Sequence, residues 1–307
     1  MTDSPFTRTP VAYAFPLERI GAHSTVVSIG SCFAEDVIGT LFGNGFRGAQ
    51  NPNGILYHPY CISDALQRID LGYTLSDFFH YGGLWHSWMH HGAFSAPSAE
   101  EALEKAETAR KTFLKALKKA DACFITLSSS VLYWHKPSKR YVANCHKVPG
   151  NEFERRLASQ KMCSASLLCA CRKVRELNPA CRLIFTLSPV RHYPGELTLN
   201  SISKARALNA ICDTLAGLEN SAYFPAYEIQ MDELRDYRFY ADDMLHPSVQ
   251  AQEYIRERLF DACFTEEAKR IFQAHLARRR REAHIPLHPE SPAETERAEA
   301  GMGKETP

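Results

Sequence analysis

The sequence predicts an α/β fold, a three-layer α/β/α sandwich built around a mainly parallel sheet. Short segments rich in Val, Ile, Leu and Phe alternate with longer segments whose apolar residues recur at helical spacing. The short segments are apolar throughout, which is typical of strands that helices cover on both faces of a parallel sheet. Such strands are expected at residues 25–29, 122–127, 182–187 and 222–226.

The longer segments are predicted to be helices. In one of them Leu208, Ile211 and Leu215 form a single apolar stripe, as expected for a helix with one buried face. Helices are expected at residues 33–42, 59–70, 98–119, 152–177, 203–218 and 248–276. The two that fall within 59–119 form a helical insertion in the sandwich.

Composition divides the chain into three parts. Residues 1–20 are an N-terminal extension that contains three prolines, and residues 21–276 are the folded domain. Four consecutive arginines begin at Arg278, and a stretch rich in Pro, Glu, Ala and Gly follows them. Such a composition cannot bury a core, so residues 277–307 are expected to be a disordered charged tail.

Overall composition is that of an ordinary globular chain. With 307 residues, 45% of them hydrophobic, the chain is long enough for one large core. A formal net charge of +1 argues against a dedicated nucleic-acid-binding protein. We find no apolar run of transmembrane length and no secretory signal in the first 16 residues. The ten cysteines lack a paired C-x-x-C framework, so mostly buried, reduced thiols and a cytoplasmic location are expected.

Ser31 is the first candidate functional residue. It stands between the strand at 25–29 and a helix that begins right after it, and Gly30 permits the tight turn. A hydroxyl at that place lies at the sheet edge, beside free backbone N–H groups that can stabilise negative charge. Ser31 is therefore either a nucleophile or a residue that caps the helix.

Asp243 and His246 are the second candidate. A carboxylate three residues before a histidine can contact the imidazole across one turn and fix its tautomer, which leaves the other ring nitrogen free to take a proton from a serine. Asp242 competes for the same role. Either aspartate has a simpler interpretation as a cap of the helix that begins near Pro247.

The order of these residues resembles that of the SGNH (GDSL-like) hydrolases, and longer motifs make the resemblance closer. The strings GSCFAED (30–36), NPNGILYHP (51–59), ANCHKVP (143–149), LSPVRH (187–192) and YFPAYEIQMDELRDYRFYADDMLHPS (223–248) are similar to successive blocks of the GSCFA domain family. That family is placed in the SGNH superfamily. The resemblance spans about residues 26–260 and implies a flavodoxin-like sandwich whose catalytic triad is Ser31, Asp243 and His246, with Asp-x-x-His spacing that favours Asp243.

The resemblance also implies an oxyanion hole. Its expected donors are the backbone N–H of Ser31 and, by analogy with the glycine block of the superfamily, the N–H of Gly54. The third donor is a departure, because the superfamily places Gly-x-Asn after its third strand and this chain has Ser128 and two more serines there. Asn144 is the expected replacement, with Ser129 or Ser130 as alternatives.

Four further residues are candidates for binding substrate. Trp88, in a segment rich in histidines and aromatics, could stack on a sugar face. Arg191, His192 and Lys204 follow the strand at 182–187 and are expected at the same sheet edge. They either bind an anionic group of the substrate or pair with carboxylates at the rim.

Two alternatives at these sites are less favoured. No pair of ligands in the histidine-rich segment has the spacing typical of zinc sites, so no metal is expected. Cys32 is a rival nucleophile, because a helix N-terminus lowers the pKa of a thiol. The Ser-Asp-His order nevertheless favours a hydroxyl mechanism.

The sequence therefore predicts a serine esterase that forms an acyl-enzyme on Ser31. Its expected substrates are small-molecule or glycan O-acyl esters, and no cofactor is expected. A glycan O-acyltransferase with the same triad is the alternative enzyme, and a non-catalytic binding protein with a degenerate site is the third possibility. The acyl group, the acceptor and the oligomeric state are not predicted.

Overall fold

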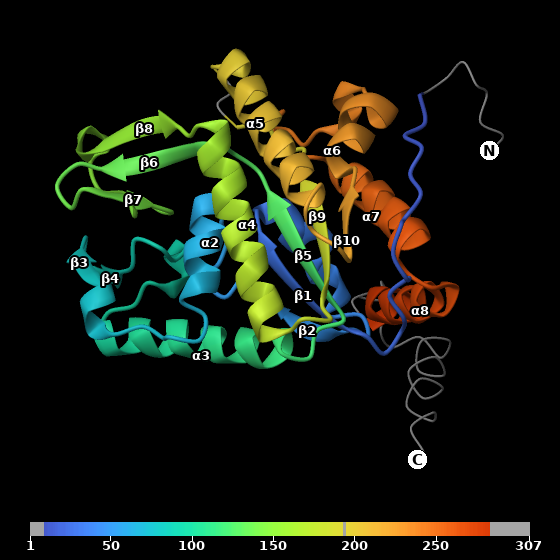
Figure 1. The fold of residues 1–307 in the computed structure, drawn as a ribbon, viewed down its shortest axis with the longest axis horizontal. Coiled ribbons are helices and arrows are strands. Elements are labelled where there is room, and N and C mark those ends of the chain that lie inside the picture. Colours follow the sequence, from blue (N-terminus) through green and yellow to red (C-terminus); the bar gives the residue numbers. More distant parts are fainter. Residues whose placement is uncertain (1–8, 193–194, 283–307) are drawn as a thin grey trace, which may run out of the picture.

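A five-stranded parallel sheet forms the centre of the protein. The computed structural model describes residues 9–192 and 195–282. The strand order is β10–β9–β5–β1–β2 (Figure 1). The strands are β1 (Thr25–Gly30), β2 (Arg47–Gln50), β5 (Ala122–Leu127), β9 (Arg182–Leu187) and β10 (Ser221–Phe224). This is a flavodoxin-like order, and the predicted α/β/α sandwich is confirmed.

Helices cover both faces of the sheet. One face packs against α2, α3, α4 and α5, and the other against α1, α7 and α8 (Figure 1). Side chains that alternate along β1 divide between the two cores, with Val27 and Ile29 on the first face and Val26 on the second. The helices are α1 (Cys32–Val37), α2 (Pro59–Gln67), α3 (Ala99–Leu117), α4 (Gln160–Leu177), α5 (Leu197–Leu215), α6 (Ala226–Glu228), α7 (Val249–Cys263) and α8 (Glu266–Glu282).

Two predicted helices, and the expected start of the C-terminal tail, differ from the structure. The first part of the expected helix 152–177 is a strand, β8 (Phe153–Leu157), which pairs with another strand of an antiparallel sheet. The expected helix 248–276 is two helices, because Thr265 caps a new one: its hydroxyl accepts the N–H of Ala268. Helix α8 continues to Glu282 across the expected start of the tail, and residues 283–307 lie outside the described residues.

Two antiparallel additions lie together beyond the carboxyl edge of the sheet (Figure 1). One is the hairpin of β3 (Phe79–Tyr81) and β4 (Leu84–His86) within the expected helical insertion. The other is a three-stranded sheet of β6 (Val131–His135), β7 (Arg140–Val142) and β8. The N–H of Ala143 donates to the carbonyl of Trp88 (2.9 Å), which joins the two additions. His90 and His91 follow the hairpin and are not in a strand.

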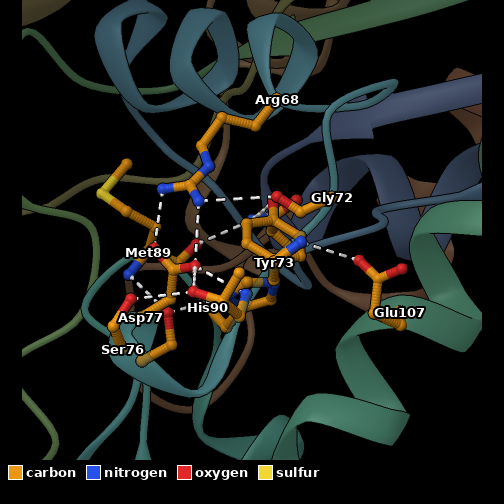
Figure 2. Close-up of polar contacts among 11 residues, drawn as sticks. Arg68, Gly72, Tyr73, Ser76, Asp77, Met89, His90 and Glu107 are labelled. Atoms are coloured by element: carbon orange, nitrogen blue, oxygen red, sulfur yellow. Dashed lines mark hydrogen bonds and ion pairs between the residues drawn. The ribbon is translucent and has the colours of Figure 1, made fainter.

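A buried polar network fixes the hairpin segment to the rest of the domain (Figure 2). Arg68 on α2 pairs with Asp77 at 2.9 Å, and its guanidinium lies 4.9 Å from the ring centre of Tyr73. The N–H of Tyr73 donates to Glu107 on α3 (2.9 Å), and the Tyr73 hydroxyl accepts the side-chain N–H of Asn53 (2.8 Å). Because Asn53 lies in the loop after β2, this network holds that loop in place at the sheet edge.

The remaining expectations concern the whole chain. All ten cysteines are free and six of them are buried. None of the helices in residues 9–192 and 195–282 has the length and apolar character needed to cross a membrane. The described part of the N-terminal extension packs on the domain, since the N–H of Val11 donates to Glu233 and Tyr13 contacts the second core.

Candidate active site

Ser31 lies at the turn between β1 and α1, as predicted. It is the N-cap residue of α1, but its side chain makes no capping hydrogen bond. The residue is completely buried, and its hydroxyl has no hydrogen-bond partner among the described residues. The structural alternative, a serine that caps the helix, is therefore not what the hydroxyl does here.

Gly30 allows this turn to pass close to the neighbouring strand. Its φ is +146°, and a Cβ built on it would lie 2.2 Å from the carbonyl oxygen of Thr126 on β5. No side chain fits without displacing the backbone. The turn is further fixed by the side-chain oxygen of Asn51, which accepts the N–H of Gly30 (2.8 Å). Sequence and packing together thus place Ser31 directly beside β5.

Gly30→Ala is expected to lower the free energy of unfolding by about 2–5 kcal/mol, since it combines backbone strain with a clash against backbone atoms. Chemical denaturation monitored by circular dichroism would measure the change. Gly217 is the matched control, because a Cβ there meets nothing within 4 Å. Gly217→Ala is expected to change the same free energy by less than about 1 kcal/mol. Equal stabilities of the two variants would contradict the packing argument.

Asp243 and His246 form a hydrogen-bonded pair. Oδ2 of Asp243 lies 2.7 Å from Nδ1 of His246, while its Oδ1 accepts the N–H groups of Leu245 (2.8 Å) and His246 (3.0 Å). These hydrogen bonds lower the pKa of Asp243 to about 2, and the two from His246 have the largest effect. An ionised carboxylate can only accept, so Nδ1 carries the proton and Nε2 is free to accept one. Ser248, rather than either aspartate, caps helix α7 by accepting the N–H of Ala251.

The His246 loop lies near helix α1, which begins directly after Ser31. The positive charge of a protonated His246 lowers the pKa of Asp36 on α1, against a larger rise caused by burial. The loop is also bound to the segment after β9, because the N–H of Arg191 donates to the carbonyl of Leu245 (3.0 Å). The pair Asp243–His246 is thus formed beside α1, while the Ser31 hydroxyl is not bonded to it in this conformation.

The expected oxyanion donors differ in whether they already donate a hydrogen bond within the protein. The N–H of Ser31 donates to the carbonyl of Thr126 (3.3 Å), and the N–H of Gly54 donates to the carbonyl of Asn51 (2.8 Å). The side-chain nitrogen of Asn144 is buried and has no partner among the described residues. Of the three, only this amide is uncommitted.

The alternative donors Ser129 and Ser130 bind α5. The hydroxyl of Ser203 lies 3.2 Å from that of Ser129 and accepts the N–H of Ser130 (2.8 Å), while the hydroxyl of Ser130 donates to the Ser203 carbonyl (3.1 Å). Ser203 therefore anchors the turn after β5 to helix α5. Its role has no sequence signal other than its place on the inner face of a helix.

Of the four expected substrate residues, His192 and Lys204 contact the same Ser128 hydroxyl, whereas Trp88 and Arg191 contact other aromatic side chains. Trp88 stacks on Phe79 with ring centres 3.8 Å apart and lies 4.3 Å from the ring of His135. Arg191 lies over the ring of Tyr240 and contacts Met231. Lys204 is buried inside the domain and donates to the carbonyl of Ser188 (2.7 Å).

His192 lies between Lys204 and the His246 loop. Its Nε2 is 2.6 Å from the hydroxyl of Ser128, and its N–H donates to the side chain of Asn200 (3.0 Å). Burial lowers the pKa of His192 to about 3, with further lowering by Lys204 and His246, so the ring is neutral. The serine that departs from the superfamily pattern, Ser128, thus belongs to this cluster.

A cavity of about 200 Å³ opens beside this cluster. Its lining comes from the segment before and within α2, from the turn after β5, from β6 and β7, and from the segment after β9. The lining residues are Tyr57, His58, Cys61, Ser129, Val131, Leu132, Tyr133, Val142, Ala143 and His192. Of the four expected substrate residues, His192 lines this cavity.

Cys32 lacks the features of an activated thiol. It is partly buried, and burial raises its pKa, with the nearby Asp36 carboxylate adding to the rise. Two backbone N–H groups oppose the rise without overcoming it. The expected lowering by the helix N-terminus is therefore wrong for this residue. In the described part of the chain, no group of three or more His, Cys, Asp or Glu residues could hold a metal ion.

A family model named GSCFA family matches residues 25–259, which include β1, the Ser31 turn and the Asp243–His246 loop. The chain belongs to the GSCFA family. The resemblance found in the sequence motifs is thereby confirmed. No match was found among curated proteins.

Several solved structures are similar to this GSCFA-family chain. One is a catalytic mutant of Axe2, an acetylxylan esterase from Geobacillus stearothermophilus, with 11% identity, a TM-score of 0.41, and coverage of 81% of this chain and 98% of that one. Another is Est2A, an acetyl xylan esterase from the rumen bacterium Butyrivibrio proteoclasticus, with 11% identity, a TM-score of 0.41, and coverage of 82% and 64%.

Proposed function

We propose that this GSCFA-family protein is a serine esterase that forms an acyl-enzyme on Ser31 and acts on O-acyl esters, such as those of carbohydrates. The observation that carries the proposal is the Asp243–His246 pair, formed at 2.7 Å on a loop near helix α1, which follows Ser31. The unpartnered Ser31 hydroxyl supports it, because a buried hydroxyl left without a bond is costly unless it has a use.

The chemistry follows the usual course of acyl transfer. Nε2 of His246 takes the hydroxyl proton while Oγ of Ser31 bonds to the ester carbon, and the proton then passes to the departing alkoxide. A water molecule, deprotonated by His246, then attacks the acyl carbon; the bond from that carbon to Oγ of Ser31 breaks, the acid leaves, and His246 returns the proton to Oγ. Because Ser31 is fully covered, substrate entry requires the segments over it to move and His246 to come within hydrogen-bond distance.

A second candidate is a binding protein with a degenerate site. The commitment of the Ser31 and Gly54 N–H groups to internal bonds favours it, since those groups cannot then receive an oxyanion. The two candidates differ in whether the Ser31 hydroxyl is activated.

Labelling with a fluorophosphonate, followed by peptide mass spectrometry, tests the proposal. An adduct on Ser31 is expected, and His246→Ala should abolish it. Unlabelled Ser31 in folded protein, together with no cleavage of acetylated glycans, would favour the binding protein. Product analysis with acyl donors, with and without a glycan acceptor, separates hydrolysis from transfer to a sugar hydroxyl.

Asn144→Ala is expected to lower turnover by about 10²–10³-fold and to leave KM nearly unchanged. We propose that its buried amide supplies an oxyanion donor, and such a donor acts only when negative charge develops on the carbonyl oxygen. Asn144→Asp should be slower still, because a carboxylate repels the oxyanion. Steady-state kinetics on a chromogenic ester measures both. A loss confined to KM would assign Asn144 to substrate binding.

A further inference from the structure

Lys204 is a buried lysine without an anionic partner. The residue is 3% exposed, and among the described residues its ammonium donates to the Ser188 carbonyl (2.7 Å) and the Ser128 hydroxyl (3.3 Å), neither of which is charged. The other buried lysine, Lys173, pairs with Asp70 (2.7 Å) and Glu176 (3.1 Å). Burying a charge without an opposite charge is costly, so Lys204 is the kind of group that is retained for function.

The cluster around Lys204 lies beside the candidate active site. Ser128 follows β5, and Ser31 follows the neighbouring parallel strand β1, in a register that pairs Gly30 with Thr126. Lys204 is within electrostatic range of Cys32, the residue after Ser31. His192 lies close enough to His246 for the charge of a protonated His246 to lower the pKa of His192. Lys204, Ser128 and His192 therefore form a cluster that lies near both the nucleophile turn and the His246 loop.

The Ser128 hydroxyl is held by two neighbours. A hydroxyl has one hydrogen to donate and two lone pairs that accept. Lys204 donates to one lone pair, and Nε2 of His192, 2.6 Å away, donates to the other in the tautomer that carries its proton there. The hydrogen of Ser128 is then left for a third group, and the described residues supply no third partner for this hydroxyl.

We propose that the Ser128 hydroxyl donates to the oxyanion that forms on the ester carbonyl, with Lys204 and His192 as positioning residues that orient and polarise it. This inference rests on the proposed esterase function and adds a donor to it. It also gives the buried ammonium its missing counter-charge, since negative charge appears near Lys204 only in the transition state. Ser128, the first of the three serines that replace Gly-x-Asn, thereby acquires a role.

A pH profile separates this role from a merely structural one. Burial lowers the pKa of Lys204 to about 7. The titratable groups that face it are Cys32 on α1, whose pKa is raised by burial, and His192 after β9, whose pKa is lowered to about 3, so both stay neutral around pH 7. The ammonium is present below its pKa and is lost above it. Turnover should therefore decline as pH rises past about 7.

The test compares Lys204→Met and Ser128→Ala with wild type. Each is expected to lower kcat by about 10²-fold with KM nearly unchanged, and the double variant should cost little more than either single one. The alkaline decline should be absent from Lys204→Met. The matched control is Lys173→Met, which removes a buried lysine outside the cluster and should keep wild-type kcat.

The outcomes that overturn the inference are distinct from those that overturn the esterase. If folded Lys204→Met keeps the wild-type kcat and pH profile, and Ser31 is still labelled by fluorophosphonate, the proposed role of Lys204 is wrong and the esterase proposal is unaffected. If the wild-type protein shows neither labelling nor ester cleavage, the esterase proposal and this inference are both wrong. If Lys204→Met does not fold, Ser128→Ala decides, because it deletes one oxygen atom: normal kcat there overturns the proposal.

Discussion

Ser31→Ala is expected to lower ester turnover by roughly 10⁴–10⁶-fold, the largest effect of any single substitution in this chain. The reason is that no other described group at the β1–α1 turn combines a nucleophilic oxygen with a nearby Asp–His pair. Because Ser31 and His246 act in one proton transfer, Ser31→Ala combined with His246→Ala should cost little more than either change. Steady-state kinetics on an acetylated substrate measures all three variants.

Cys32→Ala is the matched control for that experiment. Its thiol neighbours Ser31 at the same turn, and burial raises its pKa, so its loss should leave turnover close to that of wild type. Near-normal turnover in Ser31→Ala together with a large loss in Cys32→Ala would transfer the nucleophile to the thiol.

Asp243→Asn is expected to lower turnover by about 10³–10⁴-fold. The carboxylate accepts the proton of Nδ1, whereas an amide can present its NH₂ group to that nitrogen and thereby favour the tautomer with the proton on Nε2. A protonated Nε2 cannot take the proton of Ser31. Since the pKa of Asp243 is lowered to about 2, its own protonation should not reduce activity at neutral or mildly acidic pH. Kinetics from about pH 5 to about pH 9, where carboxylates of ordinary pKa are ionised, measures both effects.

Asp242→Asn is the control, because the neighbouring carboxylate carries the same charge while Asp243 supplies all three bonds to the His246 loop. It should keep turnover near that of wild type. Equal losses in the two variants would point to the net charge of the loop rather than to the orientation of the imidazole.

The part of the fold that could be predicted from the sequence is the part with local signals. Continuous apolar runs identified the strands at 25–29, 122–127 and 182–187, because strands covered on both faces have no polar side. The strand Arg47–Gln50 was missed, since it lies at the sheet edge and its sequence, RGAQ, has no apolar run. The strand Phe153–Leu157 lies inside a segment that the sequence predicts to be helix, because its pairing partner lies about twenty residues earlier and leaves no local pattern.

The candidate site divides in the same way. By itself the sequence determined the strand–turn–helix that carries Ser31, the Asp-x-x-His spacing and the GSCFA family, since each depends on residues close together in the chain. Only the tertiary structure decided that Lys204 is buried without a counter-charge and bonds Ser128, and that the N–H groups of Ser31 and Gly54 are already committed. Burial and hydrogen-bond partners depend on segments that are distant in sequence, and only the packing of α5 against the turn after β5 brings them together.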